Sequence, residues 1–255
     1  MNKECIIDVL RYYSSVVKEK RVNTIFGVFL KGSQNYNLDT RISDIDAVAL
    51  LIPTKNMLIT DRKLDTHSIT TQYGIISVVD IRNFAKGLLN GNPQELEILN
   101  TEFYIIENNN NKKEWEQLKN KSLYFEYINP QGTLLALQGQ MKSYYKNFQK
   151  SDTIDSKNLM HLARLNHLIF SWHEDIYTKR RSYFYKMKSP IKLSKLRNIV
   201  KTPEIESYAE FLFEEAMNVS CQDVEDYMFY YYAEEDIHNF ILELLQEELE
   251  IKIKH

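Results

Sequence analysis

Apolar and polar positions divide this chain into two parts with different periods. The first part contains short apolar runs rich in β-forming residues, at 24–30, 45–52 and 74–81. Runs of this length and composition predict β-strands. After residue 120, apolar positions recur at helical spacing among charged ones, over 131–149, 156–177, 204–217 and 222–250. The chain therefore predicts an α+β fold, in which a sheet-containing core (1–120) is followed by a helical region (121–255).

A tight turn and two carboxylates stand between the first two predicted strands. The turn reads Gly-Ser-Gln-Asn-Tyr over 32–36, and the carboxylates are Asp44 and Asp46. Because side chains alternate along a strand, the two Asp side chains project to the same side. Gly32 lets the backbone approach a ligand closely, and Ser33 offers a backbone N–H and a hydroxyl at the predicted start of a helix, where an anion is favoured. The alternative for the two acids is a turn and helix cap, but the apolar run that follows them favours a strand.

Metal ions are the natural complement of the two acids. Neighbouring carboxylates repel each other, and hard divalent cations remove this penalty. We therefore expect two Mg²⁺ ions, with Mn²⁺ as the alternative, roughly 3.5 to 4 Å apart. Asp80, near the end of the third predicted strand, would bind the metal and help to deprotonate an attacking hydroxyl. Alternatively, Asp80 caps the helix predicted over 82–89.

These residues resemble the signature of the DNA polymerase β nucleotidyltransferase superfamily, which combines a Gly-Ser turn, an Asp-x-Asp pair and a third Asp on a later strand. Within the superfamily, the chain is most similar to the RlaP-type predicted nucleotidyltransferases. That similarity lies in Gly-Ser-x-x-Tyr at 32–36, Ser-Asp-x-Asp at 43–46, and Asn-Pro followed by Glu-x-Leu at 92–99. The resemblance implies a polymerase-β-like catalytic core in 1–120, a mixed sheet flanked by helices, with the helical domain 121–255 completing a cleft.

The resemblance also implies a helix that carries Lys157, His161 and Arg164 as nucleotide-binding residues. At 100° per residue these three side chains fall within about 60° of one another, and Leu159 and Leu162 lie on the other side. Cations on one stripe suit the phosphates of a nucleotide. The alternative is that the stripe is a solvated face.

Together these features predict a metal-dependent nucleotidyltransferase. It would move a nucleoside monophosphate from a nucleoside triphosphate to an acceptor hydroxyl and release pyrophosphate. The sequence leaves open whether the acceptor is an RNA end, a protein or a small molecule. One alternative is a catalytically silent nucleotide- or RNA-binding regulatory module of the antitoxin type. Another is a phosphotransferase, which would release a nucleoside diphosphate instead.

Composition fits a chain that buries a full core. It has 255 residues, of which 44% are hydrophobic, and its mean hydropathy is −0.43. No apolar run approaches the ~20 residues that span a bilayer, and the N-terminus lacks a signal-peptide pattern, so we expect no membrane partner and a cytoplasmic location. Cys5 and Cys221 form neither a metal motif nor a disulfide framework. Locally, Asn92-Pro93 predicts a helix start and Asn108–Asn111 a polar loop.

Charge is distributed unevenly along the helical region. Over 141–201, 14 Lys and Arg stand against 4 Asp and Glu, a net of +10, whereas over 202–255, 2 cations stand against 15 acids, a net of −13. The segment 179–186 interleaves basic residues with aromatic ones, a pattern that suits RNA or another phosphate-rich acceptor. The alternative is that the acidic C-terminal helices neutralise the basic stretch within the fold.

Overall fold

The computed structural model of this chain describes residues 3–20, 23–36, 43–151, 156–178, 196, 201–220 and 227–251. Its strands are β1 (Thr24–Lys31), β2 (Asp46–Ile52), β3 (His67–Thr70), β4 (Ile75–Asp80) and β5 (Tyr104–Ile105). They form one mixed sheet in the order β3-β4-β2-β1-β5. β2 runs parallel to β4, and the other neighbouring strands are antiparallel. The three apolar runs correspond to β1, β2 and β4, and the predicted α+β class is confirmed.

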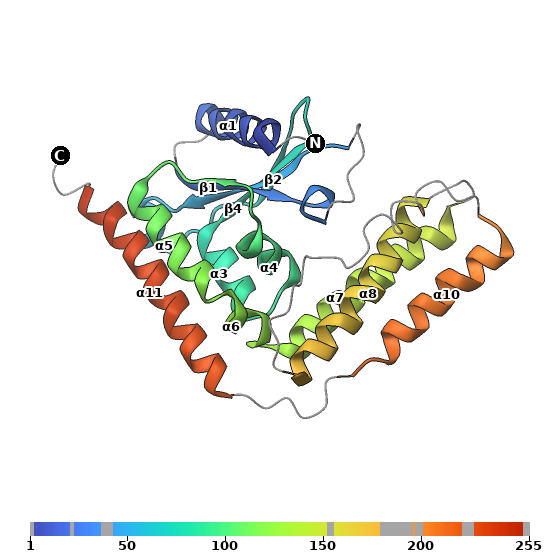
Figure 1. Ribbon diagram of the computed structural model, residues 1–255. Helices are drawn as coiled ribbons and strands as arrows, with labels where there is room; N and C mark the ends of the chain where they lie inside the picture. Colours follow the sequence, from blue (N-terminus) through green and yellow to red (C-terminus); the bar gives the residue numbers. More distant parts are fainter. Residues whose placement is uncertain are drawn as a thin grey trace.

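Helices cover both faces of this sheet (Figure 1). On one face, α1 (Lys3–Lys20) contacts β1, β2 and β5. The other face carries α3 (Ile81–Leu89), α4 (Pro93–Asn100), α5 (Asn109–Asn120), α6 (Ser122–Tyr127) and α11 (Tyr227–Ile251). A short helix, α2 (Lys55–Ile59), follows β2. Beside this layered core, α7 (Pro130–Lys150), α8 (Ser156–Thr178) and α10 (Pro203–Asn218) pack against one another as a bundle.

β2 is buried on both faces. Its even-numbered residues from Val48 to Ile52 belong to the core that includes α3, α4 and α11. Its odd-numbered residues from Ala47 to Leu51 belong to the core under α1. A strand covered on both sides has to be apolar throughout, which explains why this run does not alternate with polar residues. By the same alternation, Asp46 at the start of the strand points to the face of α3 and α4.

The helical region divides between the bundle and the core. Although α11 belongs to the predicted helical domain (121–255), it packs against β2, α3, α5 and α6 (Figure 1). The chain therefore leaves the layered core after α6, builds the bundle, and returns to the core with α11. The division into two domains at residue 120 stays a prediction.

Helix starts are set by local capping. Asn92 accepts a hydrogen bond from the N–H of Gln94, and Pro93 occupies the first turn of α4, which confirms the predicted start. The polar loop predicted at Asn108–Asn111 is wrong. Asn108 caps α5 by accepting from two backbone N–H groups, and the helix is then held by the buried Trp115. Polar residues at this position thus open a helix.

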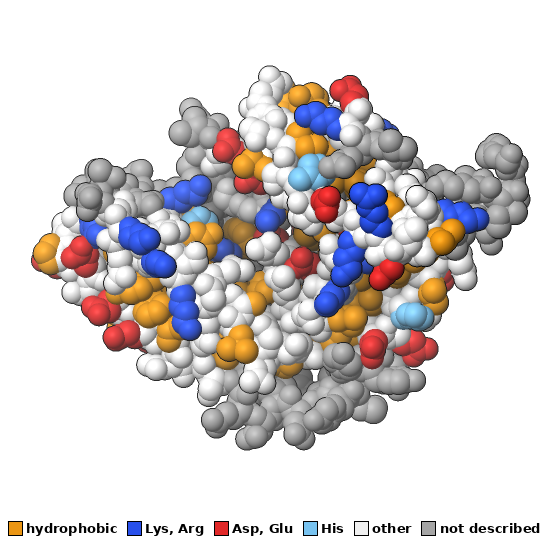
Figure 2. Space-filling model, turned by 180° about the vertical axis from the view of Figure 1, so that it is seen from behind, with side chains coloured by type: hydrophobic (Ala, Val, Ile, Leu, Met, Phe, Trp, Pro, Cys, Tyr) orange, Lys and Arg blue, Asp and Glu red, His pale blue; other side chains and the backbone are white. Residues whose placement is uncertain are grey.

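Charged side chains are interspersed on the face drawn in Figure 2, where described Lys and Arg residues lie among Asp and Glu. The basic and aromatic segment 179–186 lies outside the described residues, so both interpretations of it stay predictions. Among the described helices, none combines the length and the apolar character needed to cross a bilayer.

Glu95, in the first turn of α4, is packed against α3. A Cβ atom added to Gly87 would lie 2.6 Å from Glu95 Cγ, so the side chain fills the space beside this glycine. Within the described part of the chain, Glu95 Oε2 is buried without a hydrogen-bond partner. Burial raises the pKa of Glu95 to about 7, although a backbone hydrogen bond and the charge of Lys31 act in the opposite direction.

Glu95 should make the stability of the chain depend on pH. Because its folded pKa of about 7 exceeds the 4.5 of an exposed glutamate, the folded chain holds the proton more tightly than the unfolded chain. The free energy of unfolding should therefore fall by up to about 3 kcal/mol as the pH rises from about 4.5 to about 7. Glu95→Gln should remove this loss. Urea unfolding of both proteins at about pH 5 and about pH 8 measures the difference, and an equal pH dependence would contradict it.

Candidate functional site

The end of β1 and the start of β2 lie side by side. In their antiparallel register Lys31 pairs with Asp46, so the turn that follows Lys31 begins beside a carboxylate. A Cβ atom added to Gly32 would lie 4.0 Å from Asp46 Oδ2. The strand pairing thus brings the Gly-Ser turn and Asp46 to one edge of the sheet.

The turn itself is short and sharply bent. Gly32 has a φ of +89°, a backbone conformation that favours glycine. Ser33 opens a single 3₁₀ turn, Ser33–Tyr36, where the sequence predicts the start of a helix. The N–H of Asn35 closes this turn by donating to the Gly32 carbonyl at 3.0 Å. Ser33 therefore lies at the bend between β1 and the 3₁₀ turn.

The first residue of β4 and the glycine before it orient Asp46. The backbone N–H of Ile75 donates to Asp46 Oδ1 at 3.1 Å. A Cβ atom added to Gly74 would lie 2.6 Å from the carbonyl oxygen of Ile45, so only glycine lets the loop come this close to the strand. Asp44, two residues before Asp46, is exposed. Both carboxylates lie at the same edge, and Asp46 is the one held by a hydrogen bond.

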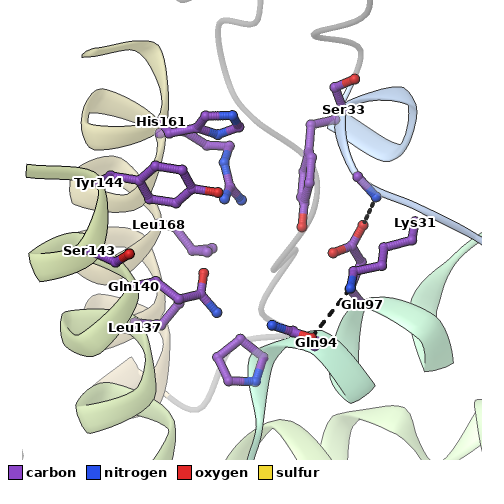
Figure 3. A pocket seen from close by; sticks show the side chains of 14 residues that line it. Lys31, Ser33, Gln94, Glu97, Leu137, Gln140, Ser143, Tyr144, His161 and Leu168 are labelled. Atoms are coloured by element: carbon purple, nitrogen blue, oxygen red, sulfur yellow. Dashed lines mark hydrogen bonds between the residues drawn. The ribbon is translucent and has the colours of Figure 1, made fainter. Parts of the chain in front are cut away.

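A cavity of about 260 Å³ opens beside the turn (Figure 3). The polar side chains in its wall are contributed by the end of β1, the turn, α4, α7 and α8. They include Lys31, Ser33, Tyr36, Gln94, Glu97, Gln140, Ser143, Tyr144, His161 and Arg164. α7 and α8 face the turn across the cavity, so the helical bundle closes one side of it.

Four of the predicted nucleotide-binding residues meet at this cavity. Gly32 and Ser33 line it from the turn, and His161 and Arg164 line it from α8. Lys157, one turn before His161, is exposed and is not among the lining residues. The predicted basic stripe therefore contributes two of its three members to the cavity wall.

Arg164 and His161 are packed on aromatic rings. The guanidinium carbon of Arg164 lies 4.6 Å from the centroid of the Tyr36 ring, and Arg164 is only 7% exposed. His161 stacks on Tyr144, with ring centroids 4.5 Å apart. Such packing holds both side chains in the wall of the cavity.

Tyr36 and Glu97 are site residues to which the sequence assigned no role, although both lie in the segments that carry the family resemblance. Burial raises the pKa of Tyr36 well above its usual range, and the charge of Glu97 acts in the same direction. Arg164 has the opposite effect. Tyr36 therefore remains a neutral phenol at the cavity.

Asp80 lies at the other end of the sheet. In the parallel register of β2 and β4, Asp80 pairs with Leu51, whereas Ile76 pairs with Ala47. Asp80 is thus about 16 Å along the strands from the level of Asp46, at roughly 3.3 Å per residue. Ile76 and Val78, which alternate with it to the same side, belong to the core under α1. The expectation that Asp80 completes a metal site with Asp44 and Asp46 is therefore corrected.

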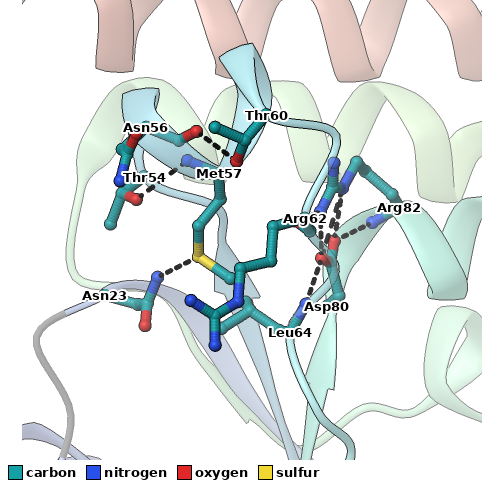
Figure 4. Close-up of polar contacts among 9 residues, drawn as sticks. All are labelled: Asn23, Thr54, Asn56, Met57, Thr60, Arg62, Leu64, Asp80 and Arg82. Carbon is teal, nitrogen blue, oxygen red and sulfur yellow. Dashed lines mark hydrogen bonds and ion pairs between the residues drawn. The ribbon is translucent and has the colours of Figure 1, made fainter.

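The alternative interpretation of Asp80, a helix cap, is confirmed (Figure 4). Its side chain is 1% exposed and accepts from the backbone N–H groups of Arg82 at 2.9 Å and Leu64 at 3.4 Å. The Arg82 guanidinium donates to it at 2.7 Å, and this bond raises the pKa of Arg82. All of these contacts tie α3 and the segment before β3 to the end of β4.

Asp44 and Asp46 are the described acids beside the turn that could hold a divalent cation. Asp44 and Asp46 supply the hard oxygen ligands that Mg²⁺ prefers, and water commonly supplies the others. Ile75 and Ser77, on the neighbouring strand β4, bring no carboxylate. Within the described ranges, no group of three or more His, Cys, Asp or Glu side chains is placed to hold a metal ion. The expectation of two ions stays a prediction.

Comparison with known proteins does not assign this chain to a family. No protein-family model matches the sequence, and no curated protein matches it. Among solved structures, the chain is similar to the crystal structure of a nucleotidyltransferase-like protein from Exiguobacterium sibiricum 255-15, with 11% sequence identity and a TM-score of 0.31. The alignment covers 96% of this chain and 79% of that one. At this TM-score and identity, the likeness establishes neither the fold nor the function of this chain.

Asp80→Asn should destabilise the folded chain without lowering its affinity for a nucleotide at the turn. The variant loses the ion pair with Arg82 while Asn keeps an oxygen that can cap α3, so we expect the free energy of unfolding to fall by about 1.5 to 3 kcal/mol. Binding of nucleoside triphosphates to the folded variant should match the wild type, because Asp80 lies at the opposite edge. Urea unfolding and calorimetric titration measure the two effects. If the folded variant bound nucleotide more weakly than the wild type, Asp80 would have a part in nucleotide binding, contrary to this prediction.

Proposed function

We propose that this chain is a nucleotidyltransferase that binds a nucleoside triphosphate in the cavity beside the Gly-Ser turn. The observation that carries this proposal is the β1–β2 register, which sets Lys31 opposite Asp46 and brings Gly32 beside its carboxylate. A turn that begins with glycine, a carboxylate pair and a cavity with cationic walls are the parts that triphosphate binding requires. The RlaP-type resemblance stays a prediction.

Each group has a distinct part in the proposed site. Gly32 and Ser33 approach the phosphates closely, and Lys31 and Arg164 offset phosphate charge. Asp44 and Asp46 would hold the divalent cations, Mg²⁺ or Mn²⁺, which would neutralise negative charge on the phosphates. The rest of the cavity would accept the nucleoside or the acceptor. Its wall there is formed by Tyr144, His161, Gln94 and Gln140.

The proposed reaction is nucleotidyl transfer. An acceptor oxygen forms a bond to the α-phosphorus, and the bond from the α-phosphorus to the oxygen that bridges to the β-phosphorus breaks. Pyrophosphate leaves, and the acceptor proton passes to solvent. The acceptor is an RNA end, a protein hydroxyl or a small molecule, as the sequence leaves open.

A second candidate is a nucleotide-binding regulatory module without turnover. The position of Asp80 favours it, because the hydroxyl-activating carboxylate expected from the sequence caps α3 instead. Such a module would bind nucleoside triphosphates and release no pyrophosphate. A phosphotransferase, the third alternative, would instead release a nucleoside diphosphate.

The experiment is label transfer from each of the four α-³²P nucleoside triphosphates, with Mg²⁺ or Mn²⁺, into host lysate. Asp46→Asn should lower transfer about 10²-fold or more, because the carboxylate that is held beside the turn loses its charge. Asp65→Asn, which changes an exposed aspartate before β3, is the matched control and should leave transfer unchanged. Nuclease and protease treatment of the labelled product identifies the acceptor class.

Two outcomes would count against nucleotidyl transfer. If Asp46→Asn transferred label as well as the wild type does, the carboxylate pair would have no part in the reaction. Tight nucleotide binding that depends on Asp46, without labelled product or pyrophosphate in any lysate fraction, would favour the regulatory module.

A further inference from the structure

The Gly-Ser turn is held by a carboxylate from another element. Glu97 Oε1, from α4, accepts the backbone N–H of Gly32 at 2.6 Å. The same oxygen accepts Asn35 Nδ2 at 2.9 Å, and Asn35 Nδ2 also donates to the Leu30 carbonyl at 3.1 Å. Glu97 is 6% exposed. One buried oxygen therefore binds the first residue of the turn and the side chain that folds back over it.

A second contact fixes Asn35 from its other side. The Thr101 hydroxyl donates to Asn35 Oδ1 at 2.8 Å, and the Thr101 N–H donates to the Glu97 carbonyl at 3.0 Å. Thr101 is 4% exposed and ends α4. The hydrogen bonds form a closed ring from the turn through Asn35 and Thr101 back to Glu97. Because both amide atoms of Asn35 are engaged, the ring defines one conformation of the turn.

The same carboxylate connects the turn to the helical bundle. The Tyr36 hydroxyl is hydrogen-bonded to Glu97 and to Arg164, and the Arg164 guanidinium lies over the Tyr36 ring. Tyr36, Glu97 and Arg164 are each more than nine-tenths buried. A buried carboxylate and a buried guanidinium are retained only where each has polar partners, and Tyr36 is the partner that the two share.

We propose that Glu97 is a positioning residue for the Gly-Ser turn, coupled through Tyr36 to Arg164 of α8. Its carboxylate points the Gly32 N–H into the protein and sets the bend from which Ser33 meets a triphosphate. Its Oε1 is occupied by the hydrogen bonds from Gly32 and Asn35, at 2.6 and 2.9 Å, so this oxygen holds the turn and does not contact the phosphates. This role rests on the proposed function, because it requires a triphosphate at the turn.

The experiment compares Glu97→Gln with two further variants of the full chain. Glu102→Gln removes the same charge at an exposed residue just beyond α4 that does not line the cavity, and it is the matched control. Thr101→Val removes one hydroxyl from the ring at a position outside the cavity, and it carries the test if Glu97→Gln does not fold. Calorimetry with Mg²⁺ measures affinity for each of the four nucleoside triphosphates and for inorganic tripolyphosphate.

We expect Glu97→Gln to bind the triphosphates and tripolyphosphate about tenfold more weakly, because a charged acceptor becomes a neutral one. Thr101→Val should weaken binding in the same direction by a few-fold, and Glu102→Gln should match the wild type. Hydrogen exchange of the segment 30–36 should become faster in Glu97→Gln and in Thr101→Val. A purely structural role would lower the melting temperature and leave the affinity of the folded protein unchanged.

The possible failures are distinguishable. A wild-type chain that binds none of these ligands overturns the proposed function, and the role of Glu97 with it. Wild-type binding that Glu97→Gln leaves unchanged overturns only the positioning role. Tighter binding by Glu97→Gln overturns it as well, and indicates that the carboxylate competes with phosphate for the turn.

Discussion

The antiparallel pairing of β1 with β2 is the constraint on which the site depends. It places Lys31 opposite Asp46, so that one strand ends in the Gly-Ser turn where the other begins with a carboxylate. A slip of one residue would turn Asp46 toward α1 and reverse both cores, because side chains alternate strictly along a strand. Packing on both faces of β2 therefore fixes the position of Asp46 as firmly as it fixes the fold.

The direction of β4 separates two groups of acids. Because β4 runs parallel to β2, the start of both strands lies at the edge with the turn, and the end of β4 lies at the opposite edge. At the near edge, β4 contributes only the N–H of Ile75 to Asp46. At the far edge, Asp80 and Arg82 join α3 to the segment before β3. In the proposed function the ligand binds at the edge with the turn, whereas the contacts of Asp80 stabilise the opposite edge.

The helical bundle completes the cavity through a few buried polar side chains. Arg164 from α8 meets Tyr36 from the turn, and Tyr36 meets Glu97 from α4. Burying such groups costs free energy unless they satisfy one another, so their contacts fix the distance between bundle and sheet. After the bundle, the chain returns to the core, where α11 packs against β2 and α3 on the side away from the bundle (Figure 1). Positioning of the turn and docking of the bundle are thus physically linked.

The sequence by itself determined the parts that local patterns encode. The apolar runs predicted β1, β2 and β4, and the capping residues predicted the start of α4. Because β2 begins at Asp46 and Asp44 precedes it, the expectation that both acids project to one side of a strand stays a prediction. A cap was one of two interpretations of Asp80, and only the parallel register decided between them. Likewise, Glu97 reaches Gly32 across 65 residues, and no local pattern encodes that contact. Periodicity and capping act over a few neighbouring residues, whereas strand direction and helix docking depend on burial shared by distant segments, so only the tertiary structure decided them.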